Sequence, residues 1–264
     1  MNVSVCTNRK IISPCGLKNL NYQVDPYVGC EHFCYYCYAL AKTETDWSKE
    51  IQTHKNIVEQ LSKEIDEIPP QTIYMGYHTD PYQPCEVEYQ QTRKALEVFI
   101  EKGFSASILT KSDLVVRDID ILKEMKDAAV SVSVAFNDNS TRRLFEAATM
   151  DTEKRIEALR RLKQAGVRTG ALVCPVIPYI TDAVKLIDLL ASHADIIWVY
   201  GLSINDRLGQ NWLTVQKILR RHFPDLIEPI EAAVFSKVDL YWTRLRENLA
   251  ALKDDRQLNL NIHI

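Results

Sequence analysis

Six short apolar or β-branched runs, each followed by a stretch with the apolar spacing of an amphipathic helix, constrain the fold of this chain more than any other feature. The six runs are 22–28, Thr72–Tyr77, Ser105–Thr110, Ala129–Phe136, Arg168–Val176 and Ile196–Leu202. Strand–helix units in series form a parallel sheet with helices outside it. The chain has 264 residues, enough for an eight-stranded barrel. Because only six strand signals are found, we predict a partial (βα)6 barrel of the TIM type.

Glycines and prolines mark where the helices are expected to end. The helix after the second run places an apolar stripe on one face and ends at Gly103, and a later helix ends at Gly166. The first stripe comprises Val87, Ala95, Leu96, Phe99 and Ile100. After Ile204 the rhythm changes, and 210–252 reads as helix broken at Pro224 and near Pro229. Residues 258–264 alternate apolar and polar, which predicts a strand at a sheet edge.

These changes in pattern suggest three parts: an N-terminal extension over 1–20, a barrel over 21–204 and a helical C-terminal extension over 205–264. The formal charge of −3 gives no overall electrostatic argument for nucleic-acid binding. We find no signal peptide and no apolar segment long enough to cross a membrane, so we expect a cytoplasmic protein. Seven cysteines, an odd number, are then expected to be thiols or metal ligands.

Three of those cysteines, Cys30, Cys34 and Cys37, lie within eight residues in a C-x3-C-x2-C pattern. Thiolates this close converge on one soft metal centre or stay reduced. Structural zinc sites and ordinary iron–sulfur clusters use four protein ligands, so three ligands from one loop leave one metal position open for chemistry. The alternative is a zinc site with His32, His78 or Cys85 as the fourth ligand.

Polar residues follow the ends of the predicted strands. The cysteine loop follows the first, Tyr77–Glu86 the second and Thr110–Asp113 the third; Ser133–Asn137 and Cys174–Pro178 end the fourth and fifth. In a parallel barrel, catalytic groups collect at this end of the strands.

With these blocks in place, the chain resembles the radical S-adenosylmethionine (SAM) superfamily, in its spore photoproduct lyase-like or "DNA repair photolyase" branch. The resemblance runs from about residue 20 to about residue 202. The matching blocks are Pro26–Ala39, Thr79–Pro84 with Glu86, Thr110–Ser112 with Arg117–Asp120, and Pro175–Pro178.

The resemblance implies a 4Fe–4S cluster on the three motif cysteines, with SAM bound to the open iron and an electron donor such as flavodoxin or ferredoxin. One-electron cleavage of SAM would give a 5′-deoxyadenosyl radical that abstracts hydrogen from a substrate. The residues that match the family's SAM site are Tyr36 along the adenine, His78, Thr79 and Asp80 at the amino group, Lys111 at the carboxylate, and Ser133 and Asn137 at the ribose.

The chain also departs from the branch pattern. The photoproduct lyase has a cysteine hydrogen donor at the end of strand two, where the nearest match here is Tyr77. Cys85 and Tyr82 are the other candidates for returning a hydrogen atom, whereas Cys174 is expected to be barrel core. The family's usual Glu-Pro after strand four is Glu146-Ala147 here.

Three functions therefore stay open: lyase-like repair of a DNA photoproduct, modification of a peptide or small metabolite, and a non-catalytic metal-binding nucleic-acid module. Basic residues outnumber acidic ones between Arg142 and Arg168. This stretch predicts either a solvated outer helix or a phosphate-contacting face.

Overall fold

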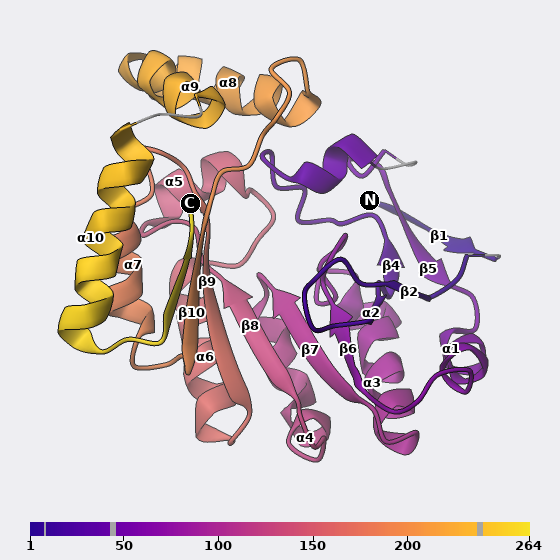
Figure 1. The fold of residues 1–264 in the computed structure, drawn as a ribbon. Helices are drawn as coiled ribbons and strands as arrows, with labels where there is room; N and C mark the ends of the chain where they lie inside the picture. The colour runs from indigo at the N-terminus through magenta and orange to yellow at the C-terminus, as the bar shows by residue number, and fades with distance from the viewer. Residues whose placement is uncertain (8, 43–45, 237–239) are drawn as a thin grey trace.

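The computed structural model describes residues 1–7, 9–42, 46–236 and 240–264. Its main feature is an eight-stranded sheet with the order β11-β10-β9-β8-β7-β6-β3-β2, open at both ends (Figure 1). Neighbouring strands are parallel except for β2 and β3. The strands are β2 (Ile12–Pro14), β3 (Tyr22–Val24), β6 (Thr72–Met75), β7 (Ser105–Thr110), β8 (Ala129–Ser133), β9 (Arg168–Val176), β10 (Ile196–Gly201) and β11 (Leu260–His263). This confirms the predicted open parallel barrel.

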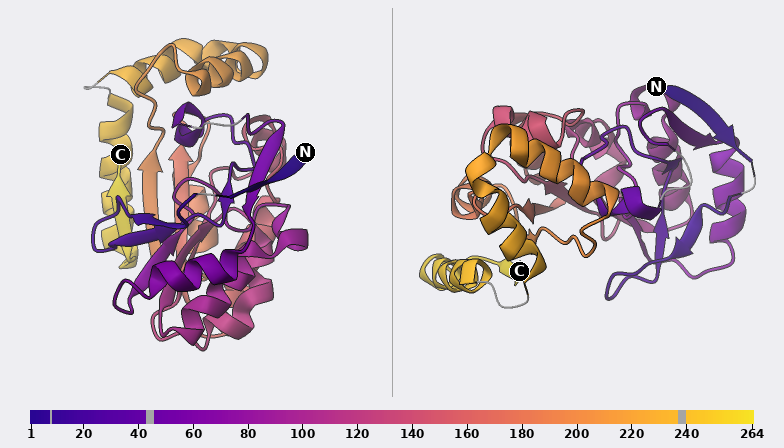
Figure 2. Two further views of the ribbon diagram at one scale, coloured as in Figure 1. Left: turned by 90° about the vertical axis from the view of Figure 1, so that its right-hand side faces the viewer. Right: turned by 90° about the horizontal axis from the view of Figure 1, so that it is seen from above.

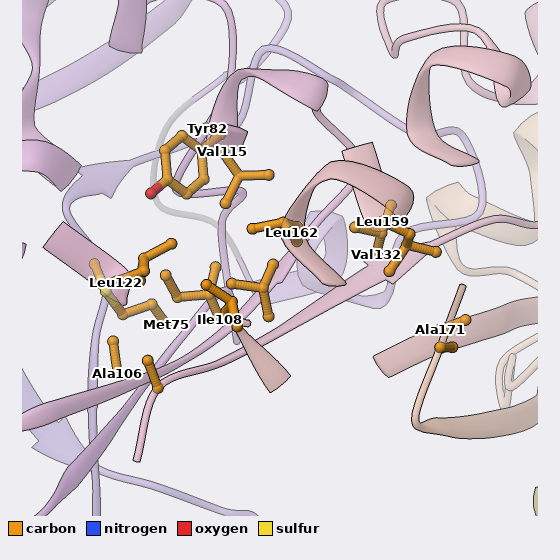
Figure 3. Packing of buried hydrophobic residues seen from close by; sticks show 14 of the residues in the cluster. Met75, Tyr82, Ala106, Ile108, Val115, Leu122, Val132, Leu159, Leu162 and Ala171 are labelled. Carbon is orange, nitrogen blue, oxygen red and sulfur yellow. The ribbon is translucent and has the colours of Figure 1, made fainter. Parts of the chain in front are cut away.

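Helices cover one face of this sheet. They are α1 (Ile57–Ile65), α3 (Gln91–Glu101), α4 (Ile119–Leu122), α6 (Thr152–Gln164), α7 (Ala183–Leu190) and α10 (Leu240–Arg256). Strand residues such as Met75, Ile108 and Val132 pack against Leu159 and Leu162 of α6 and their neighbours in one large apolar core (Figure 3). Removing this apolar area from water is the main source of stability.

The opposite side of the sheet, here called the inner face, is set by strand alternation. In β9, Val173 is fully buried in the helix-covered core, so its neighbours Leu172 and Cys174 point to the inner face and are half-buried. Trp198 and Tyr200 of β10 alternate in the same way with the buried Ile197 and Val199. The half-buried Cys174 is therefore not the core residue that the sequence suggested.

The helix ends follow the local chemistry. Gly103 and Gly166 have φ of +76° and +81° and follow α3 and α6, which confirms both predicted stops. The predicted helix through residues 87–100 is instead two helices, α2 (Glu86–Tyr89) and α3, separated by Gln90 at φ 51°. Val87 is 65% exposed and Ile100 37% exposed, so neither belongs to the buried stripe.

A second, three-stranded sheet has the order β1-β5-β4 and was not anticipated. Its strands are β1 (Asn2–Cys6), β4 (Tyr27–Val28) and β5 (Glu50–His54). The first predicted strand, 22–28, is divided at Asp25 and Pro26 between this sheet and β3. Proline fixes φ and has no N–H, which disfavours a continuous ladder at that point.

The C-terminal extension contains α8 (Gln210–His222), the short 3₁₀ helix η3 (Pro224–Leu226), α9 (Ile227–Phe235), α10 and β11. Helices α8 and α9 lie over the C-terminal ends of β9 and β10, and α10 lies beside the edge of the sheet (Figure 2). β11 adds to that edge as predicted, parallel to β10. The expected break near Pro229 is wrong, because this residue lies in the first turn of α9, where proline is tolerated.

Two further helices, the 3₁₀ helix η2 (Asp113–Asp118) and α5 (Asn139–Phe145), follow β7 and β8, and the 3₁₀ helix η1 (Tyr38–Lys42) follows the cysteine loop. Within the described ranges, no helix has the length and apolar character needed to span a bilayer.

Candidate active site

The cysteine loop, residues 29–37, begins directly after β4. Gly29 opens it with φ of +90°, and a side chain there would meet Ile51 and Trp47 at 3.0 and 3.1 Å. Short turns then shape the loop, with the Phe33 amide donating to the Cys30 carbonyl (3.2 Å) and the Cys37 amide to the Cys34 carbonyl (2.9 Å). The sequence thus presents three thiols from one compact turn.

The segment after β6 holds one side of this loop. The Glu31 amide donates to Gln83 Oε1 (2.7 Å), and Gln83 Nε2 donates to the Gly29 carbonyl (3.1 Å). His32 Nδ1 lies 3.1 Å from Asp80 Oδ2. Both His32 and Gln83 are buried, so these polar contacts are shielded from water and fix the loop to the sheet.

Helix α5 and the residues after it hold the other side. The Tyr35 amide donates to the Phe145 carbonyl (3.0 Å), and the Tyr36 hydroxyl donates to the Glu146 carboxylate. Glu146 is fully buried and also accepts from Arg155, at 2.6 Å. Burial opposes ionisation of Glu146, but Arg155 and Lys111 outweigh it and lower the pKa of this carboxyl.

Of the three motif cysteines, Cys30 and Cys34 are buried and Cys37 is half-buried. Burial raises the pKa of Cys30 to about 12 and also raises those of Cys34 and Cys37. The thiols also influence one another, since neighbouring motif cysteines are among the causes of the raised pKa of Cys30 and Cys34. A bound cation reverses this preference and stabilises thiolates. Such a donor set fits an iron–sulfur cluster.

Among the residues that the structure describes, no group of three or more His, Cys, Asp or Glu side chains is arranged to hold a single metal ion. A zinc site needs its ligands to converge on one ion, as in the alternative with His32, His78 or Cys85. A four-iron cluster instead takes one thiolate at each of three irons, so its ligands lie farther apart.

Lys111 lies beside the loop at the end of β7. Burial disfavours its ammonium, but Cys34 and Glu146 nearby outweigh burial and raise its pKa, so the side chain is a cation. Across residues 1–7, 9–42, 46–236 and 240–264, its Nζ has no hydrogen-bond or ion-pair partner. A half-buried ammonium without a partner favours an anionic ligand.

Asp80 holds neighbouring segments together. Its carboxylate accepts from Thr110 Oγ1 (2.7 Å), the Lys111 amide (2.7 Å) and the Tyr82 amide (2.9 Å). Burial raises its pKa, but His32 and these donors prevail and lower it to about 2. The oxygens of Asp80 are therefore used within the protein.

Asp25 was missed as a site residue. Its carboxylate binds the ring of His78 (Nδ1–Oδ2 2.8 Å) and accepts from the amides of His78 and Thr79 at 3.2 and 3.3 Å. It thereby fixes the segment after Gly76, where the chain turns with φ of +105° and any side chain would lie 2.3 Å from the Leu109 carbonyl oxygen. An Asp-Pro pair before the motif was its only sequence signal.

The structure brings some predicted residues together and separates others. The Tyr77 ring contacts the His78 ring edge to face, with ring centroids 4.9 Å apart. The backbone carbonyl of Tyr77 accepts a hydrogen bond from the hydroxyl of Tyr38, the residue that follows the cysteine loop. Tyr82 lies elsewhere, in the helix-covered core (Figure 3), where its hydroxyl donates to Asp118 at 3.1 Å. Cys85 is buried against Tyr27 and Ile51 rather than on the inner face.

The side chains of Ser133 and Asn137, which were expected at the SAM ribose, donate hydrogen bonds to backbone carbonyls of the protein. The hydroxyl of Ser133 donates to the Cys174 carbonyl (3.0 Å), and Asn137 donates to the Asp182 carbonyl (3.4 Å). Cys174 is the thiol that faces inward: Lys111, Glu146 and Cys37 all affect its pKa, which burial raises to about 11.

The basic stretch from Arg142 to Arg168 is not a uniform solvated face. Arg142 and Arg155 are 3% and 1% exposed and form ion pairs with Asp151 (2.7 Å) and Glu146. Arg160 pairs with Glu157 on the surface. Part of the positive charge that the sequence suggested for this surface therefore lies in the protein interior, in ion pairs.

Helix α8 packs against the cysteine loop. Its Trp212, Val215 and Leu219 form an apolar cluster with Cys34 and Tyr36 of the cysteine loop. The C-terminal extension therefore contributes directly to the surroundings of Cys34 and Cys37.

Comparison with known proteins decides the family. The model of the radical SAM superfamily matches residues 24–190, more than half of the chain and including the whole cysteine loop. This chain belongs to the radical SAM superfamily. A 4Fe–4S cluster and SAM are therefore its cofactors, and it is an enzyme of this superfamily that needs a reductant.

The chain is also similar to individual proteins. An uncharacterised protein of Methanocaldococcus jannaschii is 31% identical over 184 residues, which cover 68% of this chain and 69% of that protein. A "radical SAM Nalpha-GlyT isomerase" of Pseudomonas phage M6 is 28% identical over 106 residues, 40% of this chain and 22% of that protein. A spore photoproduct lyase variant, solved with AdoMet and dinucleoside spore photoproduct, has a TM-score of 0.63 at 17% identity, covering 98% of this chain and 80% of that one.

Proposed function

We propose that this enzyme binds its 4Fe–4S cluster through Cys30, Cys34 and Cys37 and SAM through Lys111, and that it abstracts hydrogen from a substrate bound at the inner face. The observation that supports this most is the unpartnered ammonium of Lys111 beside Cys34. An amino-acid carboxylate would satisfy that cation with a charge-assisted hydrogen bond.

Cys30, Cys34 and Cys37 would hold the cluster, which would supply the electron for reductive cleavage of SAM and so make hydrogen abstraction from the substrate possible. The protein's own residues position these groups. Asp80 and Glu146 fix the two sides of the cysteine loop, and Asp25 fixes the segment at His78 and Thr79 where the SAM amino group is expected. Tyr36 is expected along the adenine, with its hydroxyl held by Glu146.

Lys111 gives a direct test. We expect Lys111→Ala to weaken SAM binding to the reconstituted protein by about 1.5–3 kcal/mol, the range of a hydrogen bond to a charged group. Lys154→Ala is the matched control, because Lys154 is exposed on α6. Calorimetry under anaerobic conditions measures both. SAM affinity equal to that of the wild type in Lys111→Ala would remove this residue from the site.

The second part of the proposal concerns turnover. Reduced wild-type protein with SAM should form 5′-deoxyadenosine slowly without any substrate, because this cleavage needs only the cluster, an electron and bound SAM. The substrate candidates are a DNA photoproduct, a peptide and a small metabolite. Faster 5′-deoxyadenosine formation with DNA that contains thymine photoproducts, and disappearance of the lesion, would select the first.

A further inference from the structure

Three aromatic side chains of the last two sheet strands form a stack. Tyr200 of β10 and His263 of β11 are register partners, and their rings are 4.8 Å apart and 8° from parallel. Trp198, two residues before Tyr200, stacks on His263 at 5.6 Å and 17° and on Tyr200 at 6.5 Å and 14°. Residues far apart in the sequence thus align three ring planes.

This stack lies on the inner face. Ile197, Val199 and Leu260, which alternate with the three rings, are buried in the helix-covered core. Trp198 and Tyr200 are half-buried and His263 is exposed. Within the described part of the chain, none of the three belongs to an apolar cluster, and the Trp198 indole N–H, the Tyr200 hydroxyl and the His263 ring have no hydrogen-bond partner. Large rings left uncovered with free polar edges indicate a binding surface.

The stack is also close to the proposed chemistry. Val199 pairs with Val173 in the β10–β9 ladder, so Tyr200 and Cys174, the next residues of these two strands, lie beside each other on the inner face. Cys37 and Lys111 are among the groups that affect the pKa of Cys174. From the other side, Tyr74 of β6 lies near both Tyr200 and Cys174. A ligand held by the stack would therefore lie beside Cys174 on the inner face, the face at which the substrate is proposed to bind.

We propose that Trp198, Tyr200 and His263 form a stacking surface for a planar heteroaromatic ring of the substrate, with the chemistry of a nucleobase. This inference rests on the proposed function and names the substrate class for the same site. Parallel ring planes favour a flat ligand that adds a further layer, and every nucleobase offers such a face. The free indole N–H, hydroxyl and imidazole nitrogens suit the carbonyls and ring nitrogens at a base edge.

The test measures binding of thymidylyl-thymidine to the reconstituted enzyme with SAM by anaerobic calorimetry. We expect Trp198→Leu and His263→Ala each to weaken binding about 5- to 100-fold, the range for removing one stacked ring. His263→Phe keeps a ring and should bind within about threefold of the wild type. Trp242→Phe is the control, because Trp242 lies on α10, outside the sheet.

Further ligands identify the source of the base. Thymidine, single-stranded dT10, a T-rich duplex and N-acetyl-tyrosinamide are compared in the same assay. Tighter binding of dT10 than of thymidine indicates a nucleic acid, and equal binding indicates a free nucleoside. No saturable binding of any thymine compound, equal affinity in all variants, or preference for N-acetyl-tyrosinamide would overturn the inference.

Substrate-free formation of 5′-deoxyadenosine separates this inference from the proposed function. The stack variants should retain wild-type rates, because the stack contains no proposed cluster or SAM ligand. A wild-type enzyme that forms 5′-deoxyadenosine but binds no thymine compound refutes the stacking surface alone. A protein that forms none refutes the proposed function, whereas the dinucleotide affinities still decide the stacking surface.

Discussion

The Tyr36 hydroxyl donates a hydrogen bond to the carboxylate of Glu146, a residue 110 positions later in the chain. This bond joins the cysteine loop to the segment after α5. The same carboxylate pairs with Arg155 of α6, and both partners are almost completely buried. The cysteine loop and the outer helices are therefore connected through one buried carboxylate.

Removing that carboxylate should cost more than removing the phenol. Glu146→Gln leaves the Arg155 guanidinium buried without its anion, so we expect a loss of about 3–5 kcal/mol in the free energy of unfolding. Tyr36→Phe removes one donor while Arg155 still neutralises Glu146, and should cost about 1–3 kcal/mol. Urea unfolding of the iron-free proteins measures both. The reverse order would contradict this network.

Cluster loading should depend on the three motif cysteines alone. Each of Cys30→Ala, Cys34→Ala and Cys37→Ala is expected to lose the visible absorption after anaerobic reconstitution, because each removes the thiolate of one iron. Cys85→Ala and Cys174→Ala should keep that absorption and an iron content near four per chain, as this cluster type requires. A Cys34→Ala protein that reconstitutes normally would disprove the ligand assignment.

Stability should fall in acid partly through Asp80. Its pKa is about 2 in the folded protein against an ordinary value of 3.8. A lowered pKa stabilises the fold above the ordinary value, and this contribution is lost as the pH falls from about 4 to about 2. We expect Asp80→Asn to reduce the loss of unfolding free energy between pH 5 and pH 2 by about 2 kcal/mol. Asp225→Asn, at an exposed position, should leave it unchanged.

The basic stretch should contribute little to nucleic-acid binding. Arg142 and Arg155 are buried, and Arg160 is paired with Glu157. Removing one phosphate-binding side chain would lower the salt slope of duplex binding by about 0.9. If duplex DNA binds, we expect the Arg160→Ala, Arg161→Ala double variant to change that slope by less than about 0.9. A fall in the salt slope of about 1.8 would instead support the interpretation that the basic stretch contacts phosphates.

The sequence predicted the parallel sheet because β7, β9 and β10 are apolar runs with clear boundaries. Their residues form parallel ladders, with one register shift between Val199 and Gly201 in the β9–β10 pair. It did not predict β1 and β5, and it merged β4 with β3 into one strand, because these short strands gain their pairing from partners about 25 to 50 residues away. Propensity describes neighbours along the chain, whereas such ladders depend on tertiary context.

The residues of the candidate site also fall into those that local sequence signals predict and those that depend on tertiary contacts. The cysteines and Lys111 could be predicted because spacing and strand ends are local signals. The roles of Asp25 and Glu146 depend on partners at His78 and Tyr36 that only folding brings close. For the same reason, the sequence could not show that Tyr82 and Cys85, two candidates for returning a hydrogen atom, lie in packed interiors.

The cysteine loop has a consequence for how the metal enters. β4 pairs with β5 immediately before the loop, and Gln83 binds the backbone on both sides of Cys30. These contacts to the loop come from the protein itself, whereas small zinc domains owe their folding to the metal. The conformational entropy of this turn is lost when the chain folds. Cluster insertion should therefore occur as binding to a loop that is already in its bound conformation. The iron-free protein should then unfold as cooperatively as the loaded one.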